Sequence, residues 1–389
     1  MPDKAIYLDH HATTPLDKRV FNKMKTFFLC EFGNPSSRTH AYGWRALEAV
    51  NEARRQVAQA LNADAQEIIF TSGATEASNM AIKGFLSQKN HKQQIITSSI
   101  EHPATFNSIK SLEPNYAHGI FLQPKSDGII DPAQFENAIT KNTILASFFW
   151  VNSEIGSINN IREIASIAKK HGVLLHCDAA QALGRLKIDL KELDIDLISL
   201  SGHKIYGPKG IGVLYIKHEI KERFQPLLHG GAQEWSLRPG TLNVPGIVGM
   251  GEAARLSVCD LDKEVKKIKE LRDILWDNLR ALSDIYLNGS LEHRVAGNLN
   301  VSFADIDGEE LVLALCKRVA ISTGSACCSH GPSRVLEEIG VAPELRQAAI
   351  RFGIGRSNSK EEIHEVSQLV VETVKKLRAQ NKKKLVKLI

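Results

Sequence analysis

Residues 196–204 read DLISLSGHK, a short apolar run that ends in a small polar turn and the lysine at position 204. Apolar runs of this length between turn residues are typical of buried β-strands in α/β proteins. An amine held directly behind such a strand is partly removed from water, which favours its use as a nucleophile toward a carbonyl group. A lysine that merely follows a strand is the ordinary alternative, so the interpretation of Lys204 depends on the groups that accompany it.

The same kind of apolar run recurs along the first two thirds of the chain. From about residue 45 to 250, such runs alternate with segments whose apolar residues recur every three or four positions, the spacing of an amphipathic helix. This alternation predicts an α/β fold in which helices cover both faces of a mostly parallel sheet. The expected strands are 67–71, 94–98, 144–151, 173–177, 197–200 and 212–216, and the expected helices are 46–61, 75–85 and 161–171.

The pattern changes near residue 255, where a long charged amphipathic segment begins. Strand-like and helix-like segments in mixed order follow it, which predicts a second, smaller α+β domain. The N-terminal residues, about 1–15, carry no pattern that places them. The expected elements of this second part are helices at 260–282 and 309–319, strands at 298–303 and 350–353, and a final helix from residue 360.

Composition limits the classes of function. The chain has 389 residues, 43% of them hydrophobic, and a formal net charge of +5, which is too small for this length to indicate nucleic-acid binding. Its six cysteines include no CxxC pair, so they are interpreted as reduced thiols rather than as a disulfide framework. The longest apolar run, 144–151, is too short to span a membrane, and the N-terminus lacks a secretory signal pattern. These features together predict a cytoplasmic protein.

Two more strand ends carry groups that suit one flat, phosphorylated ligand. The sequence TSGATE at 71–76 reads as a strand, a tight turn and a helix start, whose backbone N–H groups near Ala74 and Thr75 would bind a phosphate. Asp178 follows the expected strand 173–177, where a buried carboxylate needs a cationic partner such as a protonated pyridine nitrogen. An ordinary helix cap is the alternative in each case.

A fourth strand end carries His102, which follows the expected strand 94–98 and could lie flat on an aromatic ring. In α/β sheets, ligands bind beyond the carboxyl ends of the strands, so these four ends would meet at one site. A phosphate cradle, an aspartate for a ring nitrogen, a lysine for a Schiff base and a stacking histidine together predict a pyridoxal 5'-phosphate pocket.

The motifs that carry these groups also identify a family. The chain resembles the class V aminotransferase group of fold-type I pyridoxal-phosphate enzymes, and within it the cysteine desulfurases of the IscS/NifS type. The resemblance runs from one end of the chain to the other. Its motifs are YLD at 7–9, ATTP at 12–15, GNPSS at 33–37, TSGATE at 71–76, DAAQ at 178–181, SGHK at 201–204, GT at 240–241 and GSAC at 324–327.

The resemblance implies a fold-type I architecture and a homodimer. Residues 16–255 would form the large cofactor-binding domain with a mostly parallel, seven-stranded sheet. Residues 1–15 and 256–389 would form the smaller α+β domain, which would carry a flexible loop around Cys327. Five residues would surround the cofactor phosphate, one of them contributed across the dimer: Ala74, Thr75, Ser201, His203 and Thr241 of the partner subunit.

The resemblance also assigns contacts to the ring and to the substrate. Gln181 would contact the ring hydroxyl, as would Ser153, which stands where the family usually has asparagine and is shorter. Asp178 would pair with the ring nitrogen, His102 would stack on the ring, and Lys204 would hold the cofactor. The substrate carboxylate would be bound by Asn34 and Arg351.

The implied reaction converts L-cysteine to L-alanine. Lys204 and His102 would move protons, while the thiolate of Cys327 would take the substrate sulfur and keep it as a persulfide. An acceptor or scaffold protein would then receive the sulfur for iron–sulfur cluster assembly or tRNA thiolation. The motifs assign no firm metal site, although Cys327 could act as a transient iron–sulfur ligand. Residues 321–333 are rich in small and turn-forming residues, which suits a thiol that carries cargo.

Two alternatives remain open from the sequence. A selenocysteine lyase would use the same pocket and the same cysteine. A non-catalytic scaffold of the same fold would instead bind a metal or cluster through Cys327, Cys328 and His330. The vicinal Cys328 could relay the sulfur from Cys327, and no direct contact with nucleic acid or membrane is expected.

Overall fold

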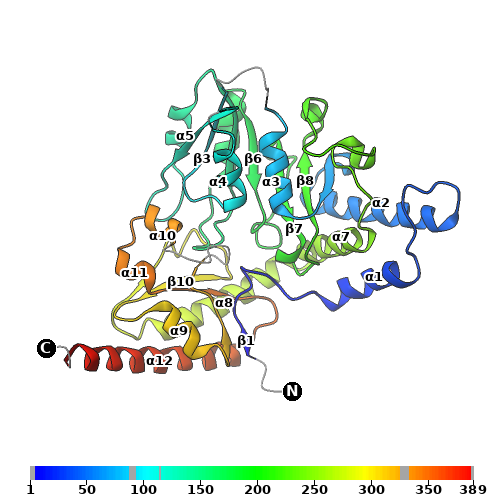
Figure 1. The fold of residues 1–389 in the computed structure, drawn as a ribbon. Helices are drawn as coiled ribbons and strands as arrows, with labels where there is room; N and C mark the ends of the chain where they lie inside the picture. The colour runs from blue at the N-terminus through cyan, green and yellow to red at the C-terminus, as the bar shows by residue number, and fades with distance from the viewer. Residues whose placement is uncertain (1–4, 87–92, 114, 325–332, 387–389) are drawn as a thin grey trace.

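The computed structural model describes residues 5–86, 93–113, 115–324 and 333–386, and a seven-stranded sheet dominates it (Figure 1). The strand order is β2-β8-β7-β6-β5-β3-β4, and only β8 runs antiparallel to its neighbours. The expected α/β class with a mostly parallel sheet is therefore confirmed. The strands are β2 Ile68–Thr71, β3 Gln93–Ser98, β4 Ala117–Leu122, β5 Thr143–Phe149, β6 Leu174–Asp178, β7 Leu197–Ser201 and β8 Gly212–Ile216.

The apolar runs became strands because both faces of the sheet are buried. Neighbouring side chains along a strand point to opposite faces, so Ile68 and Phe70 pack into one buried cluster and Ile69 into another. All six expected strands form, with ends displaced by no more than about two residues. The edge strand β4 was not predicted, because its apolar pattern is interrupted by His118 and Gly119.

Helices cover both faces of this sheet. One buried cluster unites the sheet with α2, α5, α6 and α7, and the other unites it with α3 and α4. Helix α2 begins five residues earlier than the apolar spacing predicts, because the His40 side chain caps it by accepting from the Gly43 N–H. The helices are α1 Lys18–Leu29, α2 Ala41–Leu61, α3 Ala74–Lys83, α4 Pro103–Lys110, α5 Pro132–Ala138, α6 Ile161–Lys170 and α7 Val244–Cys259.

A second, three-stranded antiparallel sheet lies beside the first and has its own buried cluster. Three helices pack on it, including the long α12 at the lower edge of Figure 1. The strands are β9 Ile285–Leu287, β10 Asn298–Phe303 and β12 Ala349–Gly353, and the helices are α8 Leu261–Leu279, α9 Gly308–Leu315 and α12 Lys360–Val386.

The C-terminal end of one predicted helix in this part of the chain is wrong. The predicted helix 309–319 stops at Leu315, and Val319–Ala320 instead forms strand β11, which pairs in parallel with β1, Ile6–Tyr7. The N-terminal segment, which had no readable pattern, contacts both larger sheets or their ends. His10 donates its N–H to the carbonyl of Gly353 in β12, and Thr14 donates its N–H to the carbonyl of His203 in the turn after β7.

Short elements complete the described chain. No helix among the described residues is long and apolar enough to cross a membrane. The short helices are α10 Arg334–Glu338 and α11 Pro343–Gln347, and 3-10 turns lie at Ala65–Glu67, Gly202–Lys204, His218–Arg223 and Gln233–Ser236.

Candidate active site

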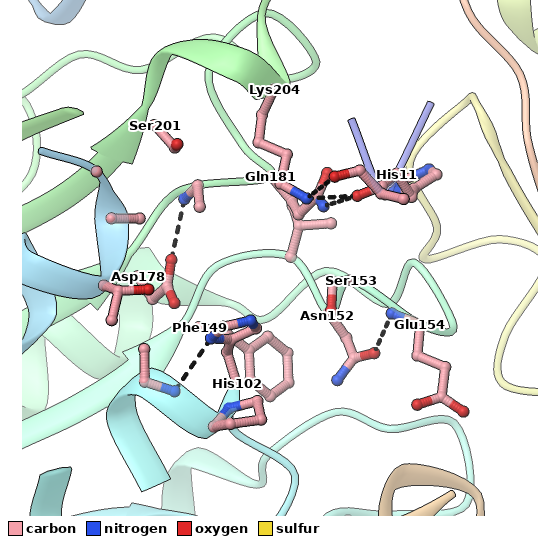
Figure 2. A pocket seen from close by; sticks show the side chains of 18 of the residues that line it. His11, His102, Phe149, Asn152, Ser153, Glu154, Asp178, Gln181, Ser201 and Lys204 are labelled. Carbon is pink, nitrogen blue, oxygen red and sulfur yellow. Dashed lines mark hydrogen bonds between the residues drawn. The ribbon is translucent and has the colours of Figure 1, made fainter. Parts of the chain in front are cut away.

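A cavity of about 560 Å³ opens at the carboxyl ends of the main-sheet strands, as expected for a ligand site in this architecture (Figure 2). Its walls come from the main sheet, the N-terminal segment, β12 and α10. The predicted site residues that line it are Ala74, Thr75, His102, Ser153, Asp178, Gln181, Ser201, His203, Lys204 and Arg351.

Lys204 ends the 3-10 turn that follows β7. Its Nζ donates to the carbonyls of His11 and Ala12, at 2.6 and 2.8 Å (Figure 2). The turn depends on Gly202, because a Cβ there would lie 2.9 Å from the Pro208 carbonyl oxygen. Backbone acceptors from the N-terminal segment therefore hold the amine inside the cavity without neutralising it.

Asp178 is the last residue of β6 and is 7% exposed. One of its oxygens accepts from the Ala180 N–H at 3.0 Å. Burial raises the pKa of this carboxyl, whereas the nearby charges of His102 and Lys204 lower it. A cationic ring nitrogen in the cavity would offset the cost of keeping the carboxylate buried and ionised.

Gln181 supplies a second test of whether a pyridoxal ring fits. Its Nε2 donates to the carbonyl of His11 at 2.9 Å, which fixes the amide. Its Oε1 is buried and has no hydrogen-bond partner among the described residues. A buried acceptor of this kind calls for a donor, and the ring hydroxyl of pyridoxal phosphate would supply one.

The start of α3, where the sequence predicts a phosphate cradle, lines the cavity. The first N–H groups of a helix have no partner within it, and the helix dipole favours an anion there. Strand β8 lies against this turn through Gly212, where a Cβ would come within 2.5 Å of the Gly73 backbone. Glu76 steadies the turn by accepting from the Ser72 N–H at 2.6 Å and from Arg238 Nε at 2.9 Å.

His203 faces the same cradle as a neutral imidazole. Burial, with the nearby charges of Lys204 and Lys209, lowers its pKa to about 4. Its Nδ1 lies 3.1 Å from Thr13 Oγ1. A neutral ring can act as donor or acceptor, so His203 can hydrogen-bond a phosphate oxygen without adding charge.

His102 is the residue that caps α4. Its Nδ1 accepts from the Ala104 N–H at 3.1 Å, and Phe149 lies beside it in the cavity wall (Figure 2). Because the lone pair on Nδ1 is committed to the helix, the neutral ring carries its proton on Nε2. While the cap is intact, Nε2–H is therefore a donor through which His102 can hydrogen-bond a ligand.

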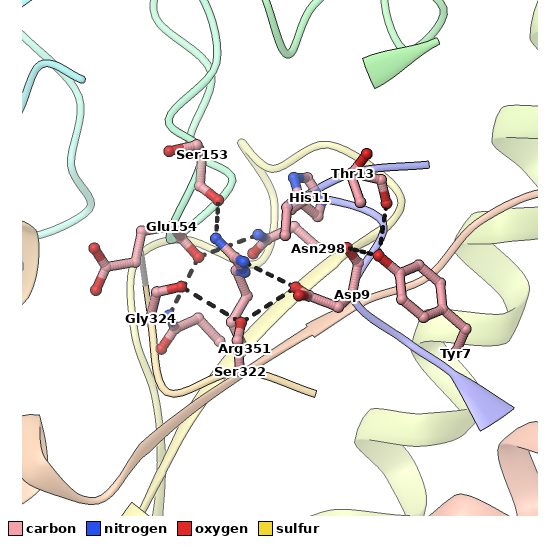
Figure 3. Close-up of polar contacts among 12 residues, drawn as sticks. Tyr7, Asp9, His11, Thr13, Ser153, Glu154, Asn298, Ser322, Gly324 and Arg351 are labelled. Carbon is pink, nitrogen blue, oxygen red and sulfur yellow. Dashed lines mark hydrogen bonds and ion pairs between the residues drawn. The ribbon is translucent and has the colours of Figure 1, made fainter. Parts of the chain in front are cut away.

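Arg351 reaches the cavity from β12, in the second sheet (Figure 3). Its Nη2 forms an ion pair with Asp9 at 2.9 Å, and its Nη1 donates to the carbonyl of Ser153 at 3.0 Å. The side chain is almost fully buried, and its Nε has no partner among the described residues. These contacts leave the guanidinium further donors for a carboxylate while fixing its orientation.

Two predicted residues are not brought to this cavity. Asn34 and Thr241 are exposed and are not among the lining residues. The Asn34 side chain accepts from the Ser36 N–H at 2.9 Å within its own turn. Their assignments, the second of which concerns a partner subunit, stay predictions.

Three named residues, Cys327, Cys328 and His330, lie outside the described residues. The last described residue before them, Gly324, lies against Glu154, whose Oε1 would be 3.1 Å from a Cβ at that glycine. In the part of the chain that is described, no cluster of histidine, cysteine and acidic side chains is arranged to hold a metal ion.

Several lining residues were not predicted. Glu101 is 1% exposed, and burial raises the pKa of its carboxyl to about 8, although Ser98 and the Phe149 N–H donate to it. The sequence carried a usable signal here, since Glu101 follows an apolar strand and precedes His102. His11 and Arg334 also line the cavity, but their places depend on contacts between distant parts of the chain.

Comparisons with known proteins find similarity along almost the whole chain. The class V aminotransferase family model matches residues 6–366. The cysteine desulfurase IscS of Actinobacillus succinogenes is 47% identical over 380 residues, which cover 96% of this chain and 93% of that protein. The cysteine desulfurase IscS of Methylobacillus flagellatus is 47% identical over 378 residues, with the same coverage.

Solved structures are similar over the whole fold. A NifS-like protein superposes with a TM-score of 0.90 at 33% identity, covering 96% of this chain and 100% of that one. The protein SspA, solved in complex with cysteine, superposes with a TM-score of 0.80 at 36% identity, covering 91% of this chain and 100% of that one.

Proposed function

Because the chain belongs to the class V aminotransferase family and is a pyridoxal-phosphate-dependent cysteine desulfurase, we propose that the cavity residues divide the reaction among them as follows. Pyridoxal phosphate, when bound, supplies an electron sink for bond cleavage in an amino-acid substrate. One observation carries the assignment. Three groups converge on a single cavity: the Lys204 amine, the buried Asp178 carboxylate and Gln181 Oε1, which has no hydrogen-bond partner in the described part of the chain.

The first task is to hold the cofactor in one orientation. Asp178 would pair with the ring nitrogen and Gln181 Oε1 would accept from the ring hydroxyl, while Ser153 would lie near the same hydroxyl. Lys204 would bind the cofactor covalently. Ala74, Thr75, Ser201 and His203 would surround the phosphate, since the first turn of α3 and the end of β7 meet there.

The second task is to bind L-cysteine and move its protons. Arg351 would bind the substrate carboxylate, with its guanidinium already oriented by Asp9 and the Ser153 carbonyl. Lys204 Nζ would transfer protons to and from the substrate carbons, and His102 would assist this transfer by donating a hydrogen bond from Nε2. The helix cap on Nδ1 supports this choice of atom, because a neutral ring that accepts at Nδ1 carries its proton on Nε2.

The third task is sulfur transfer. The thiolate of Cys327 would attack the substrate sulfur, so that the S–S bond of a persulfide forms as the C–S bond breaks. The substrate carbon keeps the electron pair of the broken bond, takes a proton and leaves as L-alanine. An acceptor or scaffold protein would then remove the sulfur for cluster assembly or tRNA thiolation. The named relatives are cysteine desulfurases, which does not favour the selenocysteine lyase alternative.

The exposed surface supports a homodimer. Large apolar side chains lie unburied on α1, on α2 and between them, where Phe28, Phe32 and Trp44 are each more than half exposed. Exposed aromatic groups gathered in one region are typical of surfaces that a second chain covers. A second copy would also explain why Thr241 is exposed in this chain. Each Thr241 is predicted to reach the phosphate bound by the other subunit of the dimer.

The remaining assignments follow the same premise. We propose that residues 16–255 form the large domain and that residues 1–15 and 256–389 form the small one, since the two sheets have separate buried clusters. The bacterial relatives support a cytoplasmic location.

Mass spectrometry after incubation with L-cysteine tests the proposal. We expect the parent protein to release L-alanine and to gain the mass of added sulfur on the peptide that contains Cys327. Cys327→Ser should abolish both, and Cys328→Ser serves as the matched control that keeps Cys327. Added sulfur on Cys328 alone, or alanine release that persists in Cys327→Ser, would contradict the role of Cys327.

A further inference from the structure

Helix α10 connects the second sheet to the loop that carries His102. On one side, Leu336 and Ile339 pack in a small buried cluster with Ile155 and with Ala349 of β12. On the other side, the polar residues of α10 face the segment between β3 and α4, and Figure 1 shows α10 close to the lower end of α4. The helix is thus attached to both halves of the molecule.

Arg334 makes the main polar contact with that segment. Its Nη2 donates to the carbonyl of Glu101 at 2.6 Å, and its guanidinium lies 3.6 Å from the centre of the Phe106 ring. Glu101 directly precedes His102, and Phe106 donates its N–H to the His102 carbonyl in the first turn of α4. Arg334 therefore holds the residues on both sides of His102.

A second residue of α10 strengthens the attachment. Glu338 accepts from Ser99 Oγ at 2.7 Å and from Gln123 Nε2 at 3.3 Å. Ser99 lies three residues before His102, and Gln123 directly follows β4. Arg334 and Glu338 thus contact the loop after β3 from the same helix, one turn apart.

We propose that Arg334 is a positioning residue for His102: it fixes the start of α4 from the second sheet, and so fixes the direction in which His102 Nε2 points. The geometry gives the reason. The His102 ring is oriented by its bond to the Ala104 N–H, so any loosening of the first turn of α4 rotates the ring. A small displacement of a group that hydrogen-bonds the reacting centre costs much rate, because that bond must be short and nearly linear. This inference rests on the proposed role of His102.

The charge of Arg334 suits this task. A hydrogen bond from a guanidinium to a carbonyl is stronger than one between neutral groups, and a cation over an aromatic face adds to it. Burial raises the pKa of the Glu101 and Glu154 carboxyls, and the nearby charge of Arg334 offsets part of that rise. Its removal would therefore loosen the loop and leave these carboxyls harder to ionise.

Two measurements test the proposal. The first is amide hydrogen–deuterium exchange of the peptide that covers residues 102–108, in protein without cofactor. The second is exchange of the Cα proton of L-alanine with solvent deuterium by the holoenzyme. This second reaction needs proton transfer in the cavity but no sulfur transfer, so it does not involve Cys327.

We expect Arg334→Ala to speed deuterium uptake at 102–108 and to slow L-alanine exchange by about 10-fold to 10²-fold, at equal cofactor content. Arg334→Lys keeps a donor and a cation, so its values should lie between those of the parent and the alanine variant. Arg318→Ala is the matched control, because Arg318 is exposed and pairs with Glu365 of α12, also exposed. It should leave both measurements unchanged.

The proposal is overturned if Arg334→Ala leaves both measurements within about 2-fold of the parent, which is the scatter expected of an uninvolved surface residue. If Arg334→Ala cannot be purified folded, the same comparison is made with Arg334→Lys alone, and parent-like values overturn the proposal. Failure of the sulfur chemistry is a separate result. In that case no persulfide would form in the parent, yet L-alanine exchange would still depend on Arg334.

Discussion

The two walls of the cavity are built in different ways. On the main-sheet wall, Asp178 and Lys204 leave the ends of buried strands whose backbones are paired by ladders of hydrogen bonds, so their spacing is set by strand register. On the opposite wall, α10 is held to the loop after β3 by a few side-chain contacts from Arg334 and Glu338. Replacing a residue of the first wall should remove a functional group and leave the other site residues in place. Replacing a contact of the second wall should instead displace the site residues relative to one another.

Lys204→Ala should give the largest effect on the main-sheet wall. Loss of the amine removes both the covalent attachment of the cofactor and the group that transfers protons, so alanine release from L-cysteine should fall about 10⁴-fold. The cofactor's visible absorption band should change at the same time, while the melting temperature stays near that of the parent. Alanine release at more than a tenth of the parent rate would contradict the assignment.

Glu101→Gln should have a large effect on stability that depends on pH. The carboxyl holds its proton more tightly when folded, because burial raises its pKa from 4.5 to about 8. The parent therefore loses stability as the pH rises through this interval, and the glutamine variant does not. The free energy of unfolding of cofactor-free protein should be measured in urea for the parent and the variant. The variant's value minus the parent's should be higher at pH ~9 than at pH ~5 by on the order of 4 kcal/mol.

The control for that prediction is Glu192→Gln, at an exposed carboxylate that pairs with Arg162. It should shift the unfolding free energy by about the same small amount at both pH values. A stability difference for Glu101→Gln that does not change with pH would mean that its carboxyl is already ionised in the folded protein.

Asp178→Asn should lower turnover by about 10²-fold while the cofactor still binds. Asparagine keeps the shape and the bond from the Ala180 N–H but cannot stabilise a protonated ring nitrogen. Turnover and cofactor content should be measured together, with Asp196→Asn as the control. Asp196 also accepts a backbone N–H beside β6, from Leu175, but is not among the residues that line the cavity. Equal losses in both variants would point to a structural cause.

Glu338→Gln should have the smallest effect, and it tests the second wall. The amide can still accept from Ser99 Oγ but without charge, so turnover should fall only about 2-fold to 3-fold. Deuterium uptake at residues 94–108 should rise in proportion. A loss as large as that in Asp178→Asn would show that the two walls are equally sensitive and that the contrast between them is wrong.

The same contrast explains what the sequence revealed. The ends of the strands could be predicted because a buried strand requires an apolar run. A polar residue that follows such a run, such as Asp178 or Lys204, is therefore easy to identify in the sequence. The contacts that hold these groups could not be read. The carbonyls of His11 and Ala12 reach Lys204 from more than 190 positions away, and a backbone acceptor leaves no mark on the residue type.

The second wall was harder to predict for the same reason. Arg334 contacts a residue 233 positions earlier, and on its own helix it has the character of an ordinary surface cation. The local sequence pattern also gave a wrong prediction where an apolar stretch could continue a helix or form a strand. Val319 continues the apolar content of α9, yet it pairs with Ile6, a partner that only the folded chain provides.

The cap that His102 forms on α4 determines which tautomer the imidazole adopts. While Nδ1 accepts from the Ala104 N–H, the neutral ring carries its proton on Nε2. A second proton could bind only at Nδ1, where it would displace the Ala104 N–H and remove the cap. The start of α4 therefore holds the neutral ring in one tautomer, so every catalytic cycle begins with the same hydrogen-bond donor directed at the ligand.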